Sequence, residues 1–482
     1  MGKKNRRRHM DMEAEGAVDA PAGRRVPTGD GRGGVSSTGA ATKATAPVPA
    51  SDLLARLDSL AVFRALLDDP VVSALRSLLE VGAEAGRAQG PGRPASDEAA
   101  RLAGAYASFV SELFASGASS LAAYVRDAAE VDANVYVRTV GSGQTPSAAM
   151  EACVTSELAT LQRVADLTPS RLLSCVGLSG AVDGAQQAGD VLAGGFLPVF
   201  DVEGDVDLAA DFRARVADIG RYGYGMFARY RAFTLDAAGS IVAVRHPDPT
   251  RLADLADYEA QKRAIVDNTR ALLAGRPAAN ILLTGDAGTG KSSTVKAVVN
   301  ELADEGLRIL EVSKDQLHLI PAVLDELSAN PLKFILFIDD LSFTVNDDNY
   351  AALKAILEGS VAAKSSNVAI YATSNRRHLV RESFADREGD EVHLNDTLQE
   401  TMSLSDRFGI HLTFEKPDKR IYLDIVRQLA TAAGIDYDPA DLDALAERYA
   451  LRRGGRSARG ARQLVDALLS GSQHVAPARR DG

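Results

Sequence analysis

The pattern of apolar and polar positions divides the chain into two parts of different character. From residue 51 to about 240, apolar residues recur three and four positions apart, which is the period of amphipathic helices. The first stripe consists of Leu53, Leu54, Leu57 and Leu60, and after Pro70 a second consists of Val71, Val72, Leu75, Leu78 and Leu79. The spacing therefore predicts a mostly helical N-terminal region over 51–244.

Further segments of this region carry the same period. Ser96, Asp97 and Glu98 are typical of a helix start, and helical patterns follow at 118–140 and 147–166. Cys153 lies in the last pattern, and we expect it to be a small buried apolar residue. The region shows no catalytic arrangement of side chains, so its stripes indicate a packed core.

Beyond residue 245, short apolar runs replace the stripes. They cover 279–283, in which Asn280 is the one polar residue, 334–338 and 368–372. Apolar runs of this length are typical of parallel strands that are buried on both faces. A helical stripe of Val295, Val298, Val299 and Leu302 follows the first run. The order of strand and helix predicts an α/β fold with a parallel sheet flanked by helices.

A glycine-rich segment directly follows the first run. It consists of Gly285, Asp286, Ala287, Gly288, Thr289, Gly290, Lys291, Ser292 and Ser293. Its first eight residues match the phosphate-loop pattern G-x-x-x-x-G-K-[ST]. Glycines let backbone N–H groups converge on phosphate oxygens, and the following helix N-terminus favours negative charge. We therefore expect Lys291 to reach the β- and γ-phosphates and Ser292 to ligate Mg²⁺.

Polar side chains end the other two runs. Asp339 and Asp340 follow the second run, and Asn375 follows the third. In a parallel sheet, these positions face the same crevice as the phosphate loop. Asp339 suits the carboxylate that holds magnesium through water. Asp340 suits the general base or the group that orients an attacking water, and Asn375 suits a second group near that water.

Arginines follow these motifs along the chain. Arg407 comes after a short predicted helix, and Arg456, Arg459 and Arg462 open another helix at three-residue spacing. Single arginines are usually solvated or ion-paired, so their order after two phosphate-site motifs is what makes them candidates. The stretch 221–231 alternates arginines and aromatics. It is typical either of a packed turn, which we favour, or of a surface that stacks nucleic-acid bases.

With these motifs, residues 245–482 resemble an AAA+ ATPase, and more narrowly an uncharacterised bacterial AAA+ family known only as a domain of unknown function. The resemblance covers about half of the chain. The matching positions are 246–249, Leu252, 261–262, 268–269, 288–293, 334–343, 371–379 and 403–409. It implies a P-loop NTPase core at 245–416 and a helical lid at 417–482, with ATP and Mg²⁺ as ligands.

The resemblance also implies roles for single residues. Residues 285–292 would be the Walker A motif, and the pair Asp339 and Asp340 the Walker B motif. Asn375 would be sensor 1. Arg407 would be an arginine finger that reaches a neighbouring subunit's nucleotide, which implies a homo-oligomer. Sensor 2 on the lid would be Arg462, with Arg459 as the alternative.

The chain departs from the wider AAA+ pattern at the second Walker B acid. Most AAA+ proteins have Glu there, whereas this chain has Asp340, although the narrower family shares the Asp. The shorter side chain implies slower hydrolysis or a different water position. The acidic stretch 385–396 fits either a solvated loop, which we favour, or an interface switch loop.

Composition and charge bound the remaining choices. The chain has 482 residues, 46% apolar and 25% charged, which suits about three globular domains. Residues 1–50 hold 8 Gly, 4 Pro and nine basic against five acidic residues, which predicts a disordered tail of charge +4. Because the net charge is −11, the remainder carries −15. Broad nucleic-acid coating by the folded part is therefore not expected.

Two cysteines, Cys153 and Cys175, exclude a disulfide framework and suit a reducing compartment. No run approaches the roughly 18 apolar residues of a membrane span, and no apolar run follows the basic N-terminus. We expect a cytoplasmic protein without a membrane partner. The histidines show no metal-ligand spacing, so magnesium that accompanies the nucleotide is the only metal expected.

Three function classes remain, in order of preference. The first is an ATPase that converts ATP to ADP and phosphate and changes the conformation of a macromolecular partner. The second is a slow nucleotide-dependent switch or loader that binds DNA or a protein. The third is a P-loop kinase, which fits less well because no acceptor pocket is recognisable. The partner itself is not identified by the sequence.

Overall fold

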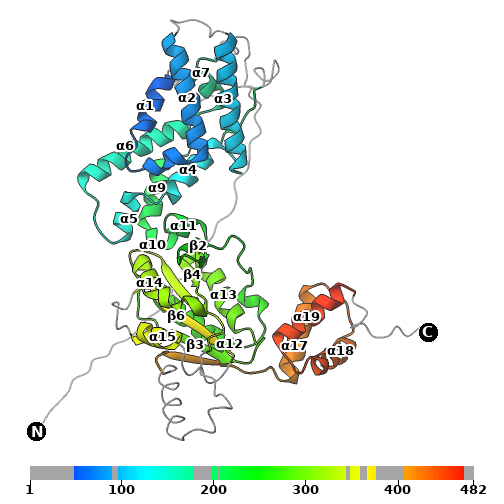
Figure 1. Ribbon diagram of the computed structural model, residues 1–482. Coiled ribbons are helices and arrows are strands. Elements are labelled where there is room, and N and C mark those ends of the chain that lie inside the picture. Colours follow the sequence, from blue (N-terminus) through cyan, green and yellow to red (C-terminus); the bar gives the residue numbers. More distant parts are fainter. Residues whose placement is uncertain are drawn as a thin grey trace, which may run out of the picture. The chain divides into compact units, whose positions relative to one another are not determined.

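The structure is a computed structural model, and it describes residues 48–88, 96–178, 197–204, 206–342, 348–358, 366–375 and 406–471 (Figure 1). The expected tail at 1–50 lies outside this range except for its last three residues. The stretch 385–396 also lies outside it.

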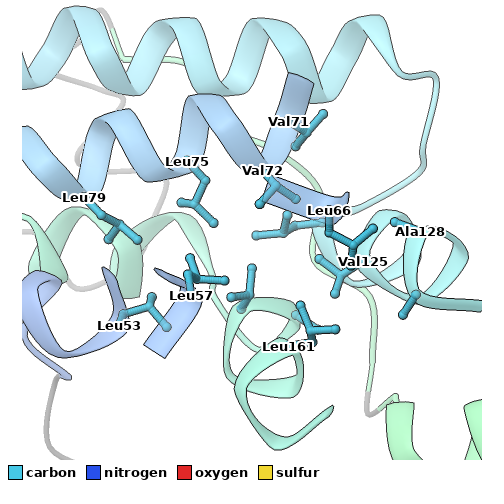
Figure 2. Close-up of a cluster of buried hydrophobic side chains, with 14 of the residues drawn as sticks. Leu53, Leu57, Leu66, Val71, Val72, Leu75, Leu79, Val125, Ala128 and Leu161 are labelled. Atoms are coloured by element: carbon cyan, nitrogen blue, oxygen red, sulfur yellow. The ribbon is translucent and has the colours of Figure 1, made fainter. Parts of the chain in front are cut away.

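The N-terminal region is helical, as its apolar period predicts. Its helices are α1 (Ala50–Asp58), η1 (Arg64–Asp68), α2 (Pro70–Ala88), α3 (Ser96–Ala115), α4 (Leu121–Val131), α5 (Val135–Gly141), α6 (Ala148–Ala165), α7 (Pro169–Cys175), α9 (Leu208–Ala217), α10 (Ile219–Tyr222) and α11 (Met226–Arg229). Figure 2 shows side chains of α1, η1, α2, α4 and α6 meeting in one apolar cluster. The two predicted stripes thus form a shared core.

Polar caps fix where several of these helices begin. The side chains of Ser120, Asn134, Ser147 and Thr168 each accept a hydrogen bond from a backbone N–H in the first turn of the following helix. A cap of this kind satisfies a donor that has no partner within the helix and contributes about 1 kcal/mol.

Helix α6 contains two residues that differ from a simple apolar stripe. Cys153 is exposed, so the expectation that it is buried is wrong. The buried face of α6 instead begins at Val154 and continues through Leu158 and Leu161. Glu157 lies on that face, and its carboxylate accepts backbone N–H bonds from residues 61–63 at 2.9–3.2 Å. These bonds tie α6 to the turn between α1 and η1.

A seven-stranded sheet forms the α/β part. Its strands are β1 (Ala232–Leu235), β2 (Ile241–Ala243), β3 (Ile281–Gly285), β4 (Leu307–Glu311), β5 (Lys333–Ile338), β6 (Val368–Ser374) and β7 (Ile410–Phe414), in the order β2-β1-β4-β5-β6-β3-β7. All neighbours are parallel except β1 and β2. The three predicted apolar runs are the adjacent central strands β3, β6 and β5.

The sheet begins earlier in the chain than expected. Strands β1 and β2 lie at 232–243, on the helical side of the boundary predicted at 244. They belong to the sheet because β1 pairs in parallel with β4, so that Phe233 lies opposite Leu310. The predicted boundary thus places two strands of the sheet with the helical region.

Alternate residues of the central strands face opposite layers of helices. From β5, Phe334, Leu336 and Ile338 join the cluster that includes α14 (Ile320–Ser328) and α15 (Asp348–Glu358). Ile335 and Phe337 join the cluster with α12 (Glu259–Leu273) and α13 (Lys291–Leu302). The described residues of this part also include the short 3₁₀ helices η3 (Leu252–Asp254), η4 (Ala303–Glu305) and η5 (Lys314–Leu319). The sheet is thus covered on both faces, as continuous apolar strands require.

The C-terminal part consists of three helices with their own core. They are α17 (Lys419–Ala432), α18 (Pro439–Arg452) and α19 (Ala458–Leu469) (Figure 1). Tyr422, Val426, Ala446 and Leu464 are among the residues buried between them. The fold class is therefore a P-loop NTPase core with a helical N-terminal region and a C-terminal helical lid.

The arginine- and tyrosine-rich stretch at 221–231 is a packed turn, the reading we favoured. The side chain of Arg221 donates a hydrogen bond to the carbonyl of Asp304 at 2.8 Å, and Arg229 pairs with Asp127 at 3.4 Å. Phe227 is buried in the sheet cluster with Phe233 and Phe334. These side chains are therefore engaged within the fold. Within the described residues, no helix is both long and apolar enough to cross a membrane.

Candidate nucleotide-binding site

The glycine-rich loop lies between the end of β3 and the start of α13. Gly285, Gly288 and Gly290 have positive φ angles of 142°, 81° and 94°, which residues with a Cβ rarely adopt. At Gly285 space is also lacking, because a Cβ would lie 2.0 Å from the carbonyl oxygen of Phe414 on β7. The motif glycines are thus required by the backbone of the loop.

Lys291, the first residue of α13, lies in the loop and is only 5% exposed. Its ammonium donates to the carbonyls of Gly285 at 2.8 Å and Asp286 at 2.9 Å, and to Asn375 Oδ1 at 3.0 Å. Burial lowers its pKa, while the carboxylates of Asp339, Asp340 and Asp286 oppose that shift. The ammonium group of Lys291 is thus held between the loop and the end of β6.

The predicted metal ligands are in direct contact. Ser292 Oγ donates to Asp339 Oδ1 at 2.6 Å. Asp339 follows the last residue of β5, so the parallel sheet brings its carboxylate to the start of α13. A hydroxyl and a carboxylate beside a phosphate loop are oxygen donors of the kind that Mg²⁺ prefers. The residues therefore fit a magnesium ion that accompanies a bound phosphate.

Asp340 is exposed and has an unusual backbone. Its φ is +52°, which places a residue with a side chain in the left-handed region. Its N–H lies 2.9 Å from Thr373 Oγ1 and 3.1 Å from Asp339 Oδ1, and its carboxylate accepts a 2.5 Å hydrogen bond from Asn375 Nδ2. Asn375 therefore contacts both Lys291 and Asp340 through its two amide atoms. Strained backbones of this kind cluster at functional sites.

A cavity of about 1070 Å³ opens at these residues. Its walls come from several segments of the chain. They are the loop and first turn of α13 (287–294), the segment 248–258 before α12, and the lid residues Ile425, Gln428, Leu429, Ala432, Ala433, Ala458, Arg459, Arg462, Val465, Asp466 and Leu469. Asp339, Asp340, Thr373 and Asn375 also line it. The lid wall thus combines apolar residues with Arg459, Arg462 and Asp466.

The segment 248–258 is fixed by contacts to its neighbours. Asn300 of α13 donates to the carbonyls of Asp248 and Thr250 at 2.8 and 2.7 Å. The hydroxyl of Tyr258 donates to the carbonyl of Glu415, and burial raises the pKa of Tyr258 to about 12. Lys262, 6% exposed, donates to the carbonyl of Leu255 and pairs with Glu259 at 2.8 Å. This wall of the cavity is therefore held at both ends.

The two lid arginines contact different parts of the cavity. The backbone N–H of Arg459 donates to the carbonyl of Gly288 at 3.2 Å, and the charge of Arg459 acts on Lys291. The charge of Arg462 acts instead on Asp248, where it adds to the hydrogen bonds from Thr250 that lower the pKa of that carboxyl. Both arginines line the cavity, and Arg459 is the one at the phosphate loop.

Arg407 lies in the turn before β7. Among the described residues that line the cavity, Arg407 is not included, whereas every other predicted site residue from Ala287 onwards is. The structure therefore brings together Lys291, Ser292, Asp339, Asp340 and Asn375, with Arg459 and Arg462 in the lid wall, and leaves Arg407 outside this group.

Two sets of cavity residues had no predicted role. Thr373 bonds both acids of the pair, and the segment 248–258 forms a wall. Thr373 carries a signal in hindsight, because it precedes Asn375 by two positions and strand residues two apart share a face. The segment 248–258 overlaps positions that matched in the family resemblance, but the side chains themselves show no motif with a known chemistry.

The fold and the site together define the chain as a protein with a P-loop NTPase core and a C-terminal helical lid. A family described as a protein of unknown function (DUF815) matches residues 228–472. The chain belongs to this family. The match begins four residues before β1, so it includes the strands β1 and β2 that the predicted boundary left out.

Solved structures with a similar fold include chains of RuvB from Thermotoga maritima. One is 17% identical, with a TM-score of 0.32 over 46% of this chain and 64% of that one. Another, described as a Holliday junction branch migration motor, is 18% identical, with a TM-score of 0.31 over 47% and 68%. This chain thus spans slightly less than two thirds of the first. A search of curated proteins gave no match.

Proposed function

We propose that this protein is an ATPase that hydrolyses ATP to ADP and phosphate at the cavity between the core and the lid. The observation that carries the proposal is the hydrogen-bonded group of Lys291, Ser292, Asp339, Asp340 and Asn375 at the end of a phosphate loop. Each of these groups has a function in phosphoryl transfer to water, and they come from three different segments of the chain.

The loop and Lys291 bind the phosphates. Lys291 holds three oxygen acceptors within 3.0 Å, and phosphate oxygens are stronger acceptors for an ammonium group than backbone carbonyls. ATP binding would therefore redirect Lys291 from the loop carbonyls to the β- and γ-phosphates. Ser292 and Asp339 would hold Mg²⁺, which neutralises charge that develops on the phosphate oxygens.

Asp340 and Asn375 orient the attacking water. Both side chains are exposed to the cavity and bond each other at 2.5 Å. A carboxylate can accept a proton from the water, and an amide can direct the lone pair of the water oxygen. Together the two groups suit in-line attack on the γ-phosphate. The Asp340 side chain is shorter than the Glu of most AAA+ proteins. Its left-handed backbone and its hydrogen bond to Asn375 would hold the carboxylate in place for this role.

Residues from the lid and from a second subunit would complete the site. Arg459, whose backbone bonds Gly288, suits sensor 2 better than Arg462. Arg407 lies outside the cavity lining, which suits a finger that acts on the nucleotide of a neighbouring subunit. The proposal thus includes a homo-oligomer in a cytoplasmic setting, and a macromolecular partner that is not identified.

The slow switch or loader, which binds DNA or a protein, is the second candidate. In the stretch 221–231, which suggests the DNA form, Arg221 donates to the carbonyl of Asp304, Arg229 pairs with Asp127 and Phe227 is buried. These contacts favour a protein partner over DNA. We also propose four parts for the chain: the tail at 1–50, a helical region, a core that begins near residue 226, and the lid from 417.

Replacement of Asp340 tests the proposal. In Asp340→Asn, the side chain keeps its shape and its contact with Asn375 but cannot take a proton. We expect ATP to stay bound, measured with a fluorescent analogue, and phosphate release to fall at least about 100-fold, as is usual on loss of a general base. An unchanged turnover number would remove Asp340 from the water-orienting role.

A further inference from the structure

Thr373 lies at the meeting point of the two acids, although the sequence assigns it no role. It is the sixth residue of β6 and is 1% exposed. Asn375 lies two positions further on, so both side chains project from the same face of the chain. The strand end thus presents two polar groups to the site, of which only Asn375 has a predicted role.

The hydroxyl of Thr373 makes one hydrogen bond to each of the two acidic residues, and the chemistry of the groups fixes which atom donates. A threonine hydroxyl has one proton to donate and lone pairs to accept with. The N–H of Asp340, 2.9 Å away, can only donate, so the hydroxyl oxygen accepts there. Its single proton therefore goes to Asp339 Oδ1 at 2.5 Å. The direction of both hydrogen bonds follows from the chemistry of the groups.

Asp339 Oδ1 receives three donors in this arrangement. They are Ser292 Oγ at 2.6 Å, Thr373 Oγ1 at 2.5 Å and the N–H of Asp340 at 3.1 Å. Three donors on one oxygen fix the rotation of the carboxylate. The other oxygen, Oδ2, would then be the one available to help hold Mg²⁺ when a nucleotide is bound.

Thr373 also supports the backbone of Asp340. A left-handed conformation is unfavourable for a residue with a side chain unless its surroundings hold it. Here Thr373 bonds on both sides of the turn, since its hydroxyl accepts from the N–H of Asp340 and its carbonyl accepts from the N–H of Leu341 at 2.7 Å. The conformation that aims the Asp340 carboxylate at Asn375 thus depends on Thr373.

We propose that Thr373 is the positioning residue of the acidic pair: its hydroxyl sets the rotation of the Asp339 carboxylate and the backbone that aims Asp340. This inference rests on the proposed ATPase function. Thr373 acts through the two acids and takes no part in proton transfer itself. Its loss therefore affects the metal requirement and the turnover number more than the binding of ATP by the loop.

The variant Thr373→Val tests the inference, because valine has nearly the shape of threonine and cannot donate or accept. Hydrogen bonds to charged groups are the stronger class, so we expect kcat to fall about 10- to 100-fold. We expect the Mg²⁺ concentration at half-maximal rate to rise by about 10-fold, while KM for ATP changes less than about 3-fold. Thr373→Ser keeps the hydroxyl and should return all three values to within about 3-fold of the wild type.

Thr269→Val is the matched control. Thr269 is fully buried in α12, and its hydroxyl bonds the carbonyl of Ile265 at 2.7 Å and the hydroxyl of Tyr371 at 2.8 Å. It therefore loses comparable hydrogen bonds in the same core without touching the acids. We expect the melting temperature of Thr269→Val to fall. Its kcat and its Mg²⁺ midpoint should stay at the wild-type values. If Thr373→Val is insoluble, Thr373→Cys replaces it in the test, because a thiol is a weak donor of similar size. We expect the stability of Thr373→Cys to lie between those of Thr373→Ser and the wild type. We expect its kcat to be lower than that of either.

The outcomes separate this inference from the function on which it rests. A wild-type protein that neither binds ATP nor releases phosphate overturns both. An active wild type with Thr373→Val at the wild-type kcat and Mg²⁺ midpoint overturns the role of Thr373 alone. An equal loss of kcat in Thr269→Val would also overturn the role of Thr373, as would a Thr373→Ser variant as slow as Thr373→Val. If Thr373→Cys is used, a soluble variant with the wild-type kcat would overturn that role too.

Discussion

Single residues in this site bridge segments that are far apart in the sequence. Asn375 contacts Lys291 with its oxygen and Asp340 with its nitrogen, and Thr373 contacts both acids. Motif spacing predicted Lys291, Ser292, Asp339, Asp340 and Asn375, because phosphate and metal chemistry restrict which residue types serve there. Thr373 could not be predicted, since a hydroxyl residue in a strand is common and only the register of β6 against β5 shows what it bonds.

The choice between the two lid arginines is a prediction at this scale. Arg459→Ala removes a charge that acts at Lys291 and keeps the backbone bond to Gly288, because that bond uses the main chain. We expect about a 10-fold loss of affinity for ATP, the size of one charge-assisted contact. Arg462→Ala is the matched variant one turn along α19, and we expect a loss under about 3-fold. A larger loss in Arg462→Ala would restore Arg462 as sensor 2.

Arg407 is tested by mixing two inactive variants. Arg407→Ala should bind ATP and lose turnover, by about 10³- to 10⁵-fold if the finger resembles those of other P-loop enzymes. Asp340→Asn keeps Arg407 but cannot activate water. In a mixed oligomer, Arg407 of the Asp340→Asn subunit would reach the intact site of its Arg407→Ala neighbour. We expect the mixture to release phosphate faster than either variant alone. No gain on mixing, with assembly verified, would argue against a finger in trans.

Elements were predicted well where their apolar pattern was long or unbroken. The helices of the N-terminal region and the strands β3, β5 and β6 are of this kind. Strands β1 and β2 were missed because they have only four and three residues, too few to show a period. Their place in the sheet depends on pairing with β4, which is distant in the sequence and leaves no local signal. The lid wall of the cavity likewise depends on packing between distant segments, so the local sequence does not predict it.

Glycine positions between elements give a prediction about stability. Gly306, between η4 and β4, has a φ of +98°, and a Cβ there would lie 2.3 Å from the carbonyl oxygen of Gly220 before α11. Alanine would therefore force the turn at 218–225 away from β4. Gly117 has a similar φ of +73° with no atom within 4 Å of its Cβ position. It controls for backbone strain alone.

We expect Gly117→Ala to lower the free energy of unfolding by about 1–2 kcal/mol, the usual cost of a left-handed alanine. Gly306→Ala should cost about 1–3 kcal/mol more, as overpacking does. Urea denaturation followed by circular dichroism measures both. Equal losses in the two variants would show that the contact between Gly306 and Gly220 is not a close one.

At the scale of the whole molecule, charge and function are separate properties. The chain carries a net charge of −11, yet its proposed ligand is an anion. Lys291, Arg459 and Arg462 at the cavity, together with the loop amides, set the field there. Net charge instead bears on non-specific association.

The most direct test of the central claim is the rate of phosphate release from Mg²⁺-ATP per subunit, measured against protein concentration. Lys291→Ala serves as the blank because it lacks the phosphate contact, and Lys296→Ala, a neighbour in α13 that pairs with Glu311 at 3.0 Å, serves as the charge-matched control. We predict a rate above the blank that rises with concentration as subunits assemble, for the wild type and Lys296→Ala alike. A wild-type rate equal to that of Lys291→Ala at every concentration would contradict the account.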